Sequence, residues 1–373
     1  MSHNKITKVL MIQGDSCGEL AYILEWLIKG DINDGILVLT GKRSVCNAKQ
    51  LEAIEARGIK IFPASARPEM SGMSEISDGI RDENQWLTPT DGFLFGLSDL
   101  HRDHLYINAN SDVGKLLDNQ RFRDLLSRMG IDAQFIPQIH KCIDNGDCIR
   151  VKDHLFLGRR TLFNLAQGEA GASVPSRTFC EAAVEQTYKI PPRSMSIDFL
   201  EVENFYHLDL YFAYGGIDHD GLDQYFVGEV MNDEPDYEPP KKELCEFKKH
   251  KLRNILNNLY GEGKYGLHSL PMIFRSVPGS VTYFYTPLNG IIDYVNNIPR
   301  YYMPYPVWGI HSPEPACMAD IRACADDAYN RMVKITGDPD RIKKFNVPLY
   351  LMAWDGSDGG QSLHCSMVVI GRN

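Results

Sequence analysis

Residues 359–367 read Gly-Gly-Gln-Ser-Leu-His-Cys-Ser-Met and place Cys365 directly after a glycine-rich stretch. Two adjacent glycines let a backbone turn tightly or come close to a ligand. The apolar run Met367–Ile370 predicts a buried strand, so Cys365 lies where a loop enters a sheet. A nucleophilic thiolate often occupies such a position, but an isolated cysteine is more often a buried structural thiol. A catalytic role for Cys365 therefore requires partner residues elsewhere in the chain.

His207 and Asp209 are the first candidate partners. They lie two residues apart within 205–212, a stretch rich in aromatic and aliphatic residues that predicts a strand. Because alternate side chains of a strand point to the same face, we expect both residues on one face. An imidazole beside a carboxylate can transfer protons or bind a cation. A half-buried strand with a polar face gives the same pattern, so the pair alone does not decide between these interpretations.

Acidic residues occur in two turn-like segments. Asp144-Asn145-Gly146-Asp147 places two carboxylates around a glycine just before a predicted strand, and Asp91 lies between Thr90 and Gly92 before another. Carboxylates in such positions can hold a planar cation through paired hydrogen bonds. Asp, Asn and Gly are also ordinary turn residues, so each segment taken alone is equally compatible with a plain surface turn.

Short apolar runs alternate with amphipathic stretches along the chain, and this pattern predicts an α/β fold. We expect a single domain over residues 1–373, because no linker-like segment divides the chain. Helices are predicted at 17–29, 48–56, 113–129, 176–188, 243–260 and 315–335. Strands are predicted at 9–12, 36–39, 59–62, 133–136, 205–212, 347–351 and 367–370, and residues 86–95 are expected to form a turn that enters another strand. Two hairpins are expected, one turning at 152–154 and one joining 281–285 to 291–294 through Pro287-Leu288-Asn289-Gly290, where Asn-Gly is a strong turn signal.

Composition limits the classes of function. Of the 373 residues, 43% are hydrophobic and 24% charged, as in an ordinary soluble globular protein, and the net charge of −10 argues against a nucleic-acid partner. No apolar run approaches the ~18 residues that predict a membrane span, and residues 1–6 lack the apolar core of a signal peptide. Nine scattered cysteines without Cys-x-x-Cys spacing predict reduced thiols, a cytoplasmic location and no metal site.

Taken together, these patterns resemble those of the guanidino-group-modifying enzymes, the pentein superfamily. This superfamily includes arginine and agmatine deiminases, dimethylarginine dimethylaminohydrolases and amidinotransferases. Its pattern runs from Arg-Asp before a strand, through an acidic-Gly-Gly-acidic turn and a His-x-Asp strand, to a glycine-rich loop ending in the nucleophilic cysteine. The matching stretches here keep this order: Thr90-Asp91, Asp144-Asn145-Gly146-Asp147, His207-Leu208-Asp209 and Gly359-Gly360 through His364-Cys365. The last of these is most similar to agmatine deiminases.

Three positions depart from the family pattern. Thr90 stands where the family usually has Arg, Asn145 replaces a glycine, and Asp144 stands where the deiminases usually carry Glu. These differences bear on the identity of the substrate more than on the chemistry. The matches cover about residues 86 to 370, and the first eighty or so residues carry no family motif.

The resemblance implies a five-bladed, pseudo-symmetric α/β propeller with a central active site. It implies that Cys365 attacks the carbon of a guanidinium group, that His207 transfers protons, and that Asp144 and Asp209 are catalytic carboxylates. Asp91, Asp144, Asp147 and Asp209 would bind the substrate cation. Neither a metal nor an organic cofactor is expected. The partner would be a small guanidine compound or an arginine side chain, with homo-oligomerisation left open.

Alternatives remain at this point. An amidinotransferase would use the same site with an amine acceptor in place of water. A non-catalytic binding protein of the same fold would not need a cysteine, a histidine and several acids together. An unrelated thiol hydrolase, such as a cysteine protease, would not need the extra acids, and the segment around Cys365 lacks a familiar protease pattern. A C–N hydrolase of the deiminase type is therefore the preferred hypothesis.

Overall fold

The computed structural model describes residues 5–13, 17–39, 47–63, 93–95, 104–108, 120–136, 143, 145–158, 161–162, 165, 177–192, 195–200, 207–218, 220–231, 241–276, 282–307, 315–348, 353–354 and 367–372. Within these residues the chain forms five β-sheets and six α-helices.

Two of the sheets have more than three strands. The first has the order β18 (Met367–Arg372), β1 (Ile6–Gln13), β2 (Gly35–Leu39), β3 (Ile59–Pro63). The second has the order β10 (Phe212–Ile217), β11 (Asp223–Val230), β12 (Tyr265–Ser276), β13 (Thr282–Tyr285), β17 (Ala353–Trp354).

The other three sheets have three strands each. They are β4 (Phe93–Phe95), β5 (His104–Asn108), β6 (Asp132–Ile136); β7 (Cys148–Val151), β8 (His154–Gly158), β9 (Ser196–Leu200); and β14 (Ile291–Val295), β15 (Ile298–Val307), β16 (Ile342–Pro348).

The α-helices connect parallel strands. They are α1 (Cys17–Lys29), α2 (Ala48–Ala56), α6 (Gln120–Arg128), α8 (Arg177–Thr187), α9 (Lys241–Tyr260) and α10 (Pro315–Thr336). Three short 3₁₀ helices are η3 (Asn145–Asp147), η4 (Leu208–Leu210) and η5 (Pro339–Arg341).

One strand arrangement recurs in every sheet. An edge strand pairs antiparallel with the next strand, which pairs parallel with a third strand after a helical crossover. Parallel neighbours require such a crossover, whereas antiparallel neighbours do not. In the first sheet the edge strand is β18, which comes from the other end of the chain and pairs with β1. The first and last described strands therefore complete one unit together.

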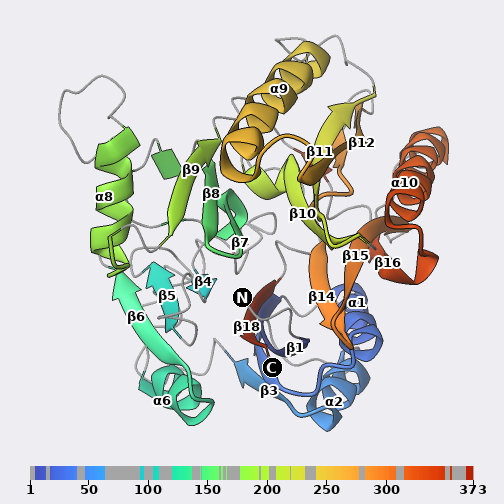
Figure 1. Cartoon of the computed structure of the whole chain (residues 1–373). Helices are drawn as coiled ribbons and strands as arrows, with labels where there is room; N and C mark the ends of the chain where they lie inside the picture. Colours follow the sequence, from blue (N-terminus) through green and yellow to red (C-terminus); the bar gives the residue numbers. More distant parts are fainter. Residues whose placement is uncertain are drawn as a thin grey trace.

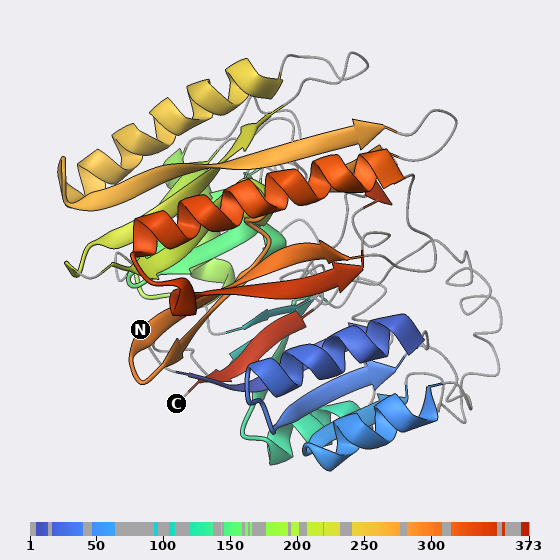
Figure 2. The ribbon, with the colours of Figure 1, turned by 90° about the vertical axis from the view of Figure 1, so that its right-hand side faces the viewer.

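The five sheets are arranged around the middle of the molecule, with the helices outside them (Figure 1). The edge strands β4, β7, β10, β14 and β18 lie innermost and are called the inner strands below. In the side view α9 and α10 run along β12, one on each side of it (Figure 2), and both helices contact this strand.

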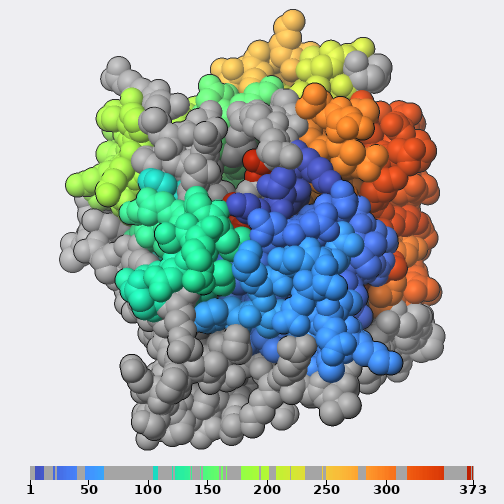
Figure 3. All heavy atoms as spheres, turned by 90° about the horizontal axis from the view of Figure 1, so that it is seen from below, coloured from blue at the N-terminus to red at the C-terminus, as the bar shows by residue number. Residues whose placement is uncertain are grey.

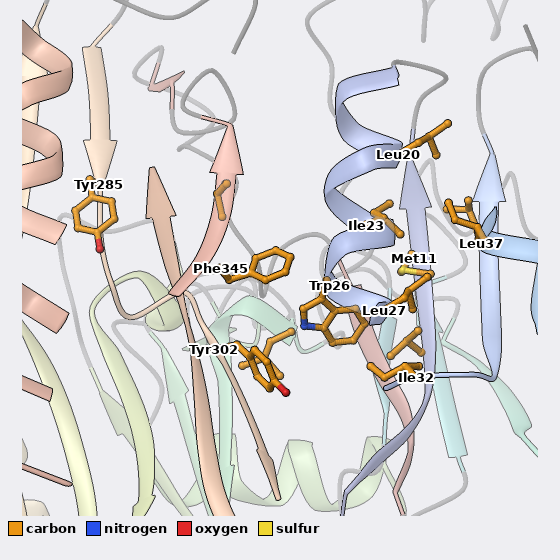
Figure 4. Close-up of a cluster of buried hydrophobic side chains, with 14 of the residues drawn as sticks. Met11, Leu20, Ile23, Trp26, Leu27, Ile32, Leu37, Tyr285, Tyr302 and Phe345 are labelled. Carbon is orange, nitrogen blue, oxygen red and sulfur yellow. The ribbon is translucent and has the colours of Figure 1, made fainter. Parts of the chain in front are cut away.

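Hydrophobic clusters fill the space between neighbouring units. Helix α1 is apolar at three- and four-residue intervals, and this stripe buries Trp26 in a cluster shared with the β14–β16 unit. Figure 4 shows Trp26 facing Tyr302 of β15 and Phe345 of β16. A second cluster joins β2 and β18 to Phe122 and Leu126 of α6. Seen from below in Figure 3, the N-terminal segments and α6 lie side by side.

Most expected elements are present. The structure confirms the strands that open and close the chain, the hairpin at 152–154 and all six helices, although α6 is described only from Gln120 onwards. The strand expected at 347–351 is instead the end of β16, which begins at Ile342. Six of the described strands were not expected from the sequence, namely β5, β9, β11, β12, β15 and β17.

Two expectations about local structure are wrong. β13 and β14 do not form a hairpin, because β13 pairs with β12 and β17 while β14 pairs with β15. The Asn289-Gly290 segment therefore crosses from one sheet to another. The strand expected over 205–212 begins only at Phe212, and Leu208–Leu210 is a 3₁₀ turn. Among the described helices, none is both long and apolar enough to span a bilayer.

Candidate active site

Three of the six expected site residues, His207, Asp209 and Asp147, belong to the described part of the chain. Cys365, Asp91 and Asp144 lie outside the described residues, although elements are described within two positions of each.

Every expected site residue comes shortly before an inner strand. Cys365 and Asp91 precede the first residues of β18 and β4 by two positions. The acidic turn 144–147 leads into β7, and His207 with Asp209 leads into β10. β18 contacts β4, and η3 contacts η4. The inner strands that follow these motifs are far apart in the sequence, and they surround the centre of the molecule (Figure 1).

The His-x-Asp motif is held by a tight turn. His207 has an extended backbone with φ −126° and ψ 151°, and η4 follows it directly. Leu208 and Leu210 are buried on the apolar side of this turn, which accounts for the alternating sequence pattern without a strand. His207 is 6% exposed and Asp209 3% exposed, so both polar side chains are also taken out of bulk water.

The acidic turn packs directly on the histidine. A Cβ atom built on Gly146 would lie 2.5 Å from Nδ1 of His207 and 2.8 Å from its Cγ. Real Cβ atoms do not approach other atoms this closely, so the imidazole can occupy its place only because residue 146 is a glycine. The two motifs, which the sequence alone cannot place relative to each other, are therefore in contact.

Asp147 links this turn to two other segments. Its Oδ2 accepts a 2.7 Å hydrogen bond from the backbone N–H of Thr161, and its Oδ1 accepts a 3.2 Å bond from that of Leu208. The residue is 1% exposed, and a side chain at Gly158 would overlap its carboxylate. Hydrogen bonds from backbone donors satisfy a buried carboxylate. Asp147 therefore joins the acidic turn to the residue that follows His207.

Asn289 reaches Asp209 from the segment that leads into β14. Its side-chain Nδ2 donates a 2.8 Å hydrogen bond to Oδ2 of Asp209, and it is completely buried. Burial, together with the negative charge of Asp209, raises the pKa of nearby Tyr301, whose hydroxyl donates to the carbonyl of Leu288. Sequence reasoning missed Asn289 because Asn-Gly predicts a hairpin turn. Its position two residues before a strand, as for Cys365, is the signal that could have identified it.

These side chains combine two chemical capacities. A buried imidazole can exchange protons, and a buried carboxylate two residues further along the chain can bind a cation strongly, because both are shielded from water. No group of three or more His, Cys, Asp or Glu within the described ranges is placed to hold a metal ion. With Cys365, Asp91 and Asp144 outside those ranges, the expectation of a metal-free site stays a prediction.

Comparison with known proteins gives a fold but no family. No family model matches the chain. No curated protein matches it either. A solved structure described as that of "a putative peptidyl-arginine deiminase" is similar over 98% of this chain and 96% of its own, with a TM-score of 0.53 and 11% sequence identity. At this identity the likeness shows that the two chains share a mixed α/β fold along nearly their whole lengths.

Proposed function

We propose that this protein is a hydrolase of guanidine compounds in which Cys365 is the nucleophile. The single observation that carries the proposal is the contact between His207 and Gly146. Two motifs of the expected guanidine site, separated by 61 residues, adjoin each other as a common substrate would require. The deiminase description of the solved structure with the same fold supports the same reaction class.

We interpret the five units as the blades of an α/β propeller formed by the whole chain, residues 1–373, as a single catalytic domain. The recurring strand-strand-helix-strand arrangement and the pairing of β18 with β1 support this interpretation. In such a fold the starts of the inner strands face a common centre. Cys365, Asp91 and Asp144 would then lie near His207 and Asp209.

The cation-binding role falls to Asp91, Asp144 and Asp209. A guanidinium carbon is a poor electrophile because its positive charge is spread over three nitrogens, and carboxylates that hold those nitrogens fix its orientation toward the nucleophile. The sequence pattern places Asp147 in the same group. Its two backbone hydrogen bonds favour a different role, in which it holds His207 and the acidic turn in register.

Covalent catalysis would proceed in two steps. The thiolate of Cys365 donates an electron pair to the guanidinium carbon, and the C–N bond breaks as His207 gives its proton to the leaving ammonia or amine. Water then transfers a proton to His207 and attacks the resulting thiouronium carbon. The C–S bond breaks and the hydroxyl proton passes to solvent, which returns the thiolate and releases a ureido product. These steps use no metal or organic cofactor, and a reduced thiol suits a cytoplasmic protein.

An amidinotransferase is the alternative function, because an amine acceptor attacking the same intermediate would replace water. Nothing in His207, Asp209 or the acidic turn distinguishes the two acceptors. Both reactions share the first half and differ only in what reaches the thiouronium carbon.

The test is product analysis with a panel of guanidines: arginine, agmatine, dimethylarginine and an arginine-containing peptide. The peptide separates action on a free substrate from action on a protein side chain. We expect ammonia or amine and a ureido product in equal amounts from at least one member, and none from neutral ureas, which lack the cation. Release of the leaving amine only when an amine acceptor is added would identify a transferase. Failure to produce either outcome with any guanidine would contradict the proposal.

A second measurement examines the proton transfer. His207→Asn should lower kcat by roughly 10²–10⁴-fold with a smaller effect on KM, because proton transfer contributes to the rate and not to binding. An Asn at this position keeps a planar polar side chain against Gly146, so the packing there is largely preserved. Equal losses in binding and rate would instead indicate that His207 acts mainly in holding the substrate.

A further inference from the structure

We infer that Asn289 is a positioning residue of this site, which holds the carboxylate of Asp209 in a fixed orientation. The inference rests on the proposed function, because it concerns how the same site holds its cationic substrate. It adds a residue from the β14–β16 unit, to which none of the expected sequence motifs belongs.

The first argument comes from position. Asn289 precedes inner strand β14 by two residues, as Cys365 precedes β18 and Asp91 precedes β4. The expected motifs lie at the starts of four inner strands, and β14 is the fifth. Since the units share one strand arrangement, Asn289 occupies the place in its unit that candidate catalytic residues occupy in the others.

The second argument comes from the hydrogen bond itself. Nδ2 of Asn289 lies 2.8 Å from Oδ2 of Asp209, and the two residues are 0% and 3% exposed. Burial favours the protonated form of a carboxyl group, whereas a donated hydrogen bond favours the ionised form. A neutral amide supplies this bond without a compensating positive charge. A lysine or arginine partner would instead compete with a cationic substrate for the same carboxylate.

The third argument is that the backbone carrying Asn289 is itself held in place. The hydroxyl of Thr286 donates to the carbonyl of Leu210 at 2.9 Å and accepts from the N–H of Leu288 at 3.2 Å. Tyr301 donates to the carbonyl of Leu288 at 2.8 Å. The segment 286–290 is therefore joined to η4 at two points, once through Thr286 and once through Asn289. Such second contacts orient a charged group that must act on substrate.

Asn289→Asp is the sharpest test, because it keeps the size of the side chain and places a second carboxyl group 2.8 Å from Asp209. Two carboxylates at this distance cannot both ionise freely, so the pair retains a proton to higher pH. We expect the acidic limb of the pH profile of kcat/KM to shift to higher pH by about one unit or more. Activity should recover in part at high pH. Asn289→Ala should lower kcat/KM by roughly 10- to 100-fold.

Two controls separate positioning from general stability. Thr286→Val removes the other tie of the same segment while leaving Asp209 untouched, so it should lower the thermal midpoint without moving the acidic limb. The swap of Asp209→Asn with Asn289→Asp keeps one amide and one carboxylate in the pair but relocates the charge. We expect it to restore most of the thermal stability and to leave kcat/KM as low as in Asp209→Asn alone.

The outcomes are distinguishable. If the wild-type protein turns over no guanidine, the proposed function fails and this inference fails with it. If the wild-type protein is active but Asn289→Asp has the wild-type pH profile with kcat/KM within about twofold, only the role of Asn289 is overturned. Recovery of activity in the swapped pair would also overturn it, since the position of the charge would then not matter.

Discussion

The imidazole of His207 lies so close to Gly146 that a Cβ atom on the glycine would fall 2.5 Å from Nδ1. The two residues belong to turns that lead into different inner strands, β10 and β7. The ring therefore rests on backbone, which is less mobile than a side chain. This contact gives His207 a defined place relative to the acidic turn.

Gly146→Ala should disable the site more than it destabilises the fold. The added methyl group would displace the imidazole, and catalytic groups must be held within fractions of an ångström. We expect a fall in kcat/KM of about 100-fold, measured with the most active guanidine. Gly337→Ala is the control, because Gly337 has φ +70° and no atom within 4 Å of its Cβ position. It should cost about 1 kcal/mol of stability and leave turnover intact.

Asp147→Asn should weaken both stability and activity. The amide can accept only one of the two backbone hydrogen bonds from Thr161 and Leu208, and its NH₂ group would face the other donor. An unsatisfied buried donor costs about 1–3 kcal/mol, which urea denaturation would detect. Asp124→Asn, on the exposed face of α6, is the matched control. If Asp147→Asn unfolds at the same urea concentration as the control, the carboxylate does not hold the turn.

Periodicity predicted the outer parts of the fold well. Helix α1 and the strands beside it are recognisable because their apolar residues repeat at helical or strand intervals. Strand β11 of the second sheet was missed because Asp223, Gln224 and Tyr225 are all buried, so no alternation marks it. The strand expected over 205–212 was wrong for a related reason. Leu208 and Leu210 alternate as the buried residues of a strand do, but they pack around a 3₁₀ turn.

The sequence singles out candidate residues for a site but says nothing of their geometry. Motif order suggested that His207 and the acidic turn share a site, but only packing shows that Gly146 is the point of contact. Asn289 was missed because an Asn-Gly pair usually marks a hairpin turn. Here the glycine is required for a different reason, because a Cβ on Gly290 would lie 2.5 Å from the carbonyl oxygen of Tyr302.

Asp209→Asn should reduce catalysis far more than a similar change at another buried aspartate. Loss of a charge-assisted contact costs about 1.5–3 kcal/mol, which corresponds to roughly 10- to 150-fold in kcat/KM. Asp223 pairs with the far end of β10, about 17 Å from the start of that strand, and binds Lys152 and Tyr214. Asp223→Asn should therefore destabilise the protein while active molecules keep their kcat/KM. Equal kinetic losses in both variants would argue against substrate binding by Asp209.

Cys365→Ala should abolish turnover without unfolding the protein, because the covalent mechanism has no substitute for the thiolate. Cys148, Cys180, Cys317 and Cys324 form no disulfide and are all buried, and burial raises the pKa of Cys324 to about 12. Iodoacetamide at neutral pH should thus spare these four, and a guanidine substrate should protect Cys365. Turnover retained in Cys365→Ala, as in the control Cys324→Ala, would rule out the proposed nucleophile.

Asp293→Asn should change how stability depends on pH. Oδ1 of Asp293 accepts from the backbone N–H of Ile6 at 2.6 Å and lies 3.9 Å from Arg372, so it connects β14 to β1 and β18. Burial raises the pKa of this carboxyl group despite these contacts. The folded protein therefore holds the proton to higher pH than the unfolded chain does. The stabilising effect of that proton is complete below the ordinary carboxyl pKa and is lost as the pH rises through the folded value.

The measurement is the free energy of unfolding in urea from pH 4 to pH 8 for the wild type, for Asp293→Asn and for a surface control. Subtracting the variant from the wild type removes the contribution of all other groups. This difference should fall as the pH rises, because only the wild type loses a proton from position 293. Glu52→Gln, on the exposed side of α2, should give a difference that is flat or of opposite slope. A difference for Asp293→Asn that increases with pH would mean that ion pairing with Arg372 outweighs burial at this junction of the terminal strands.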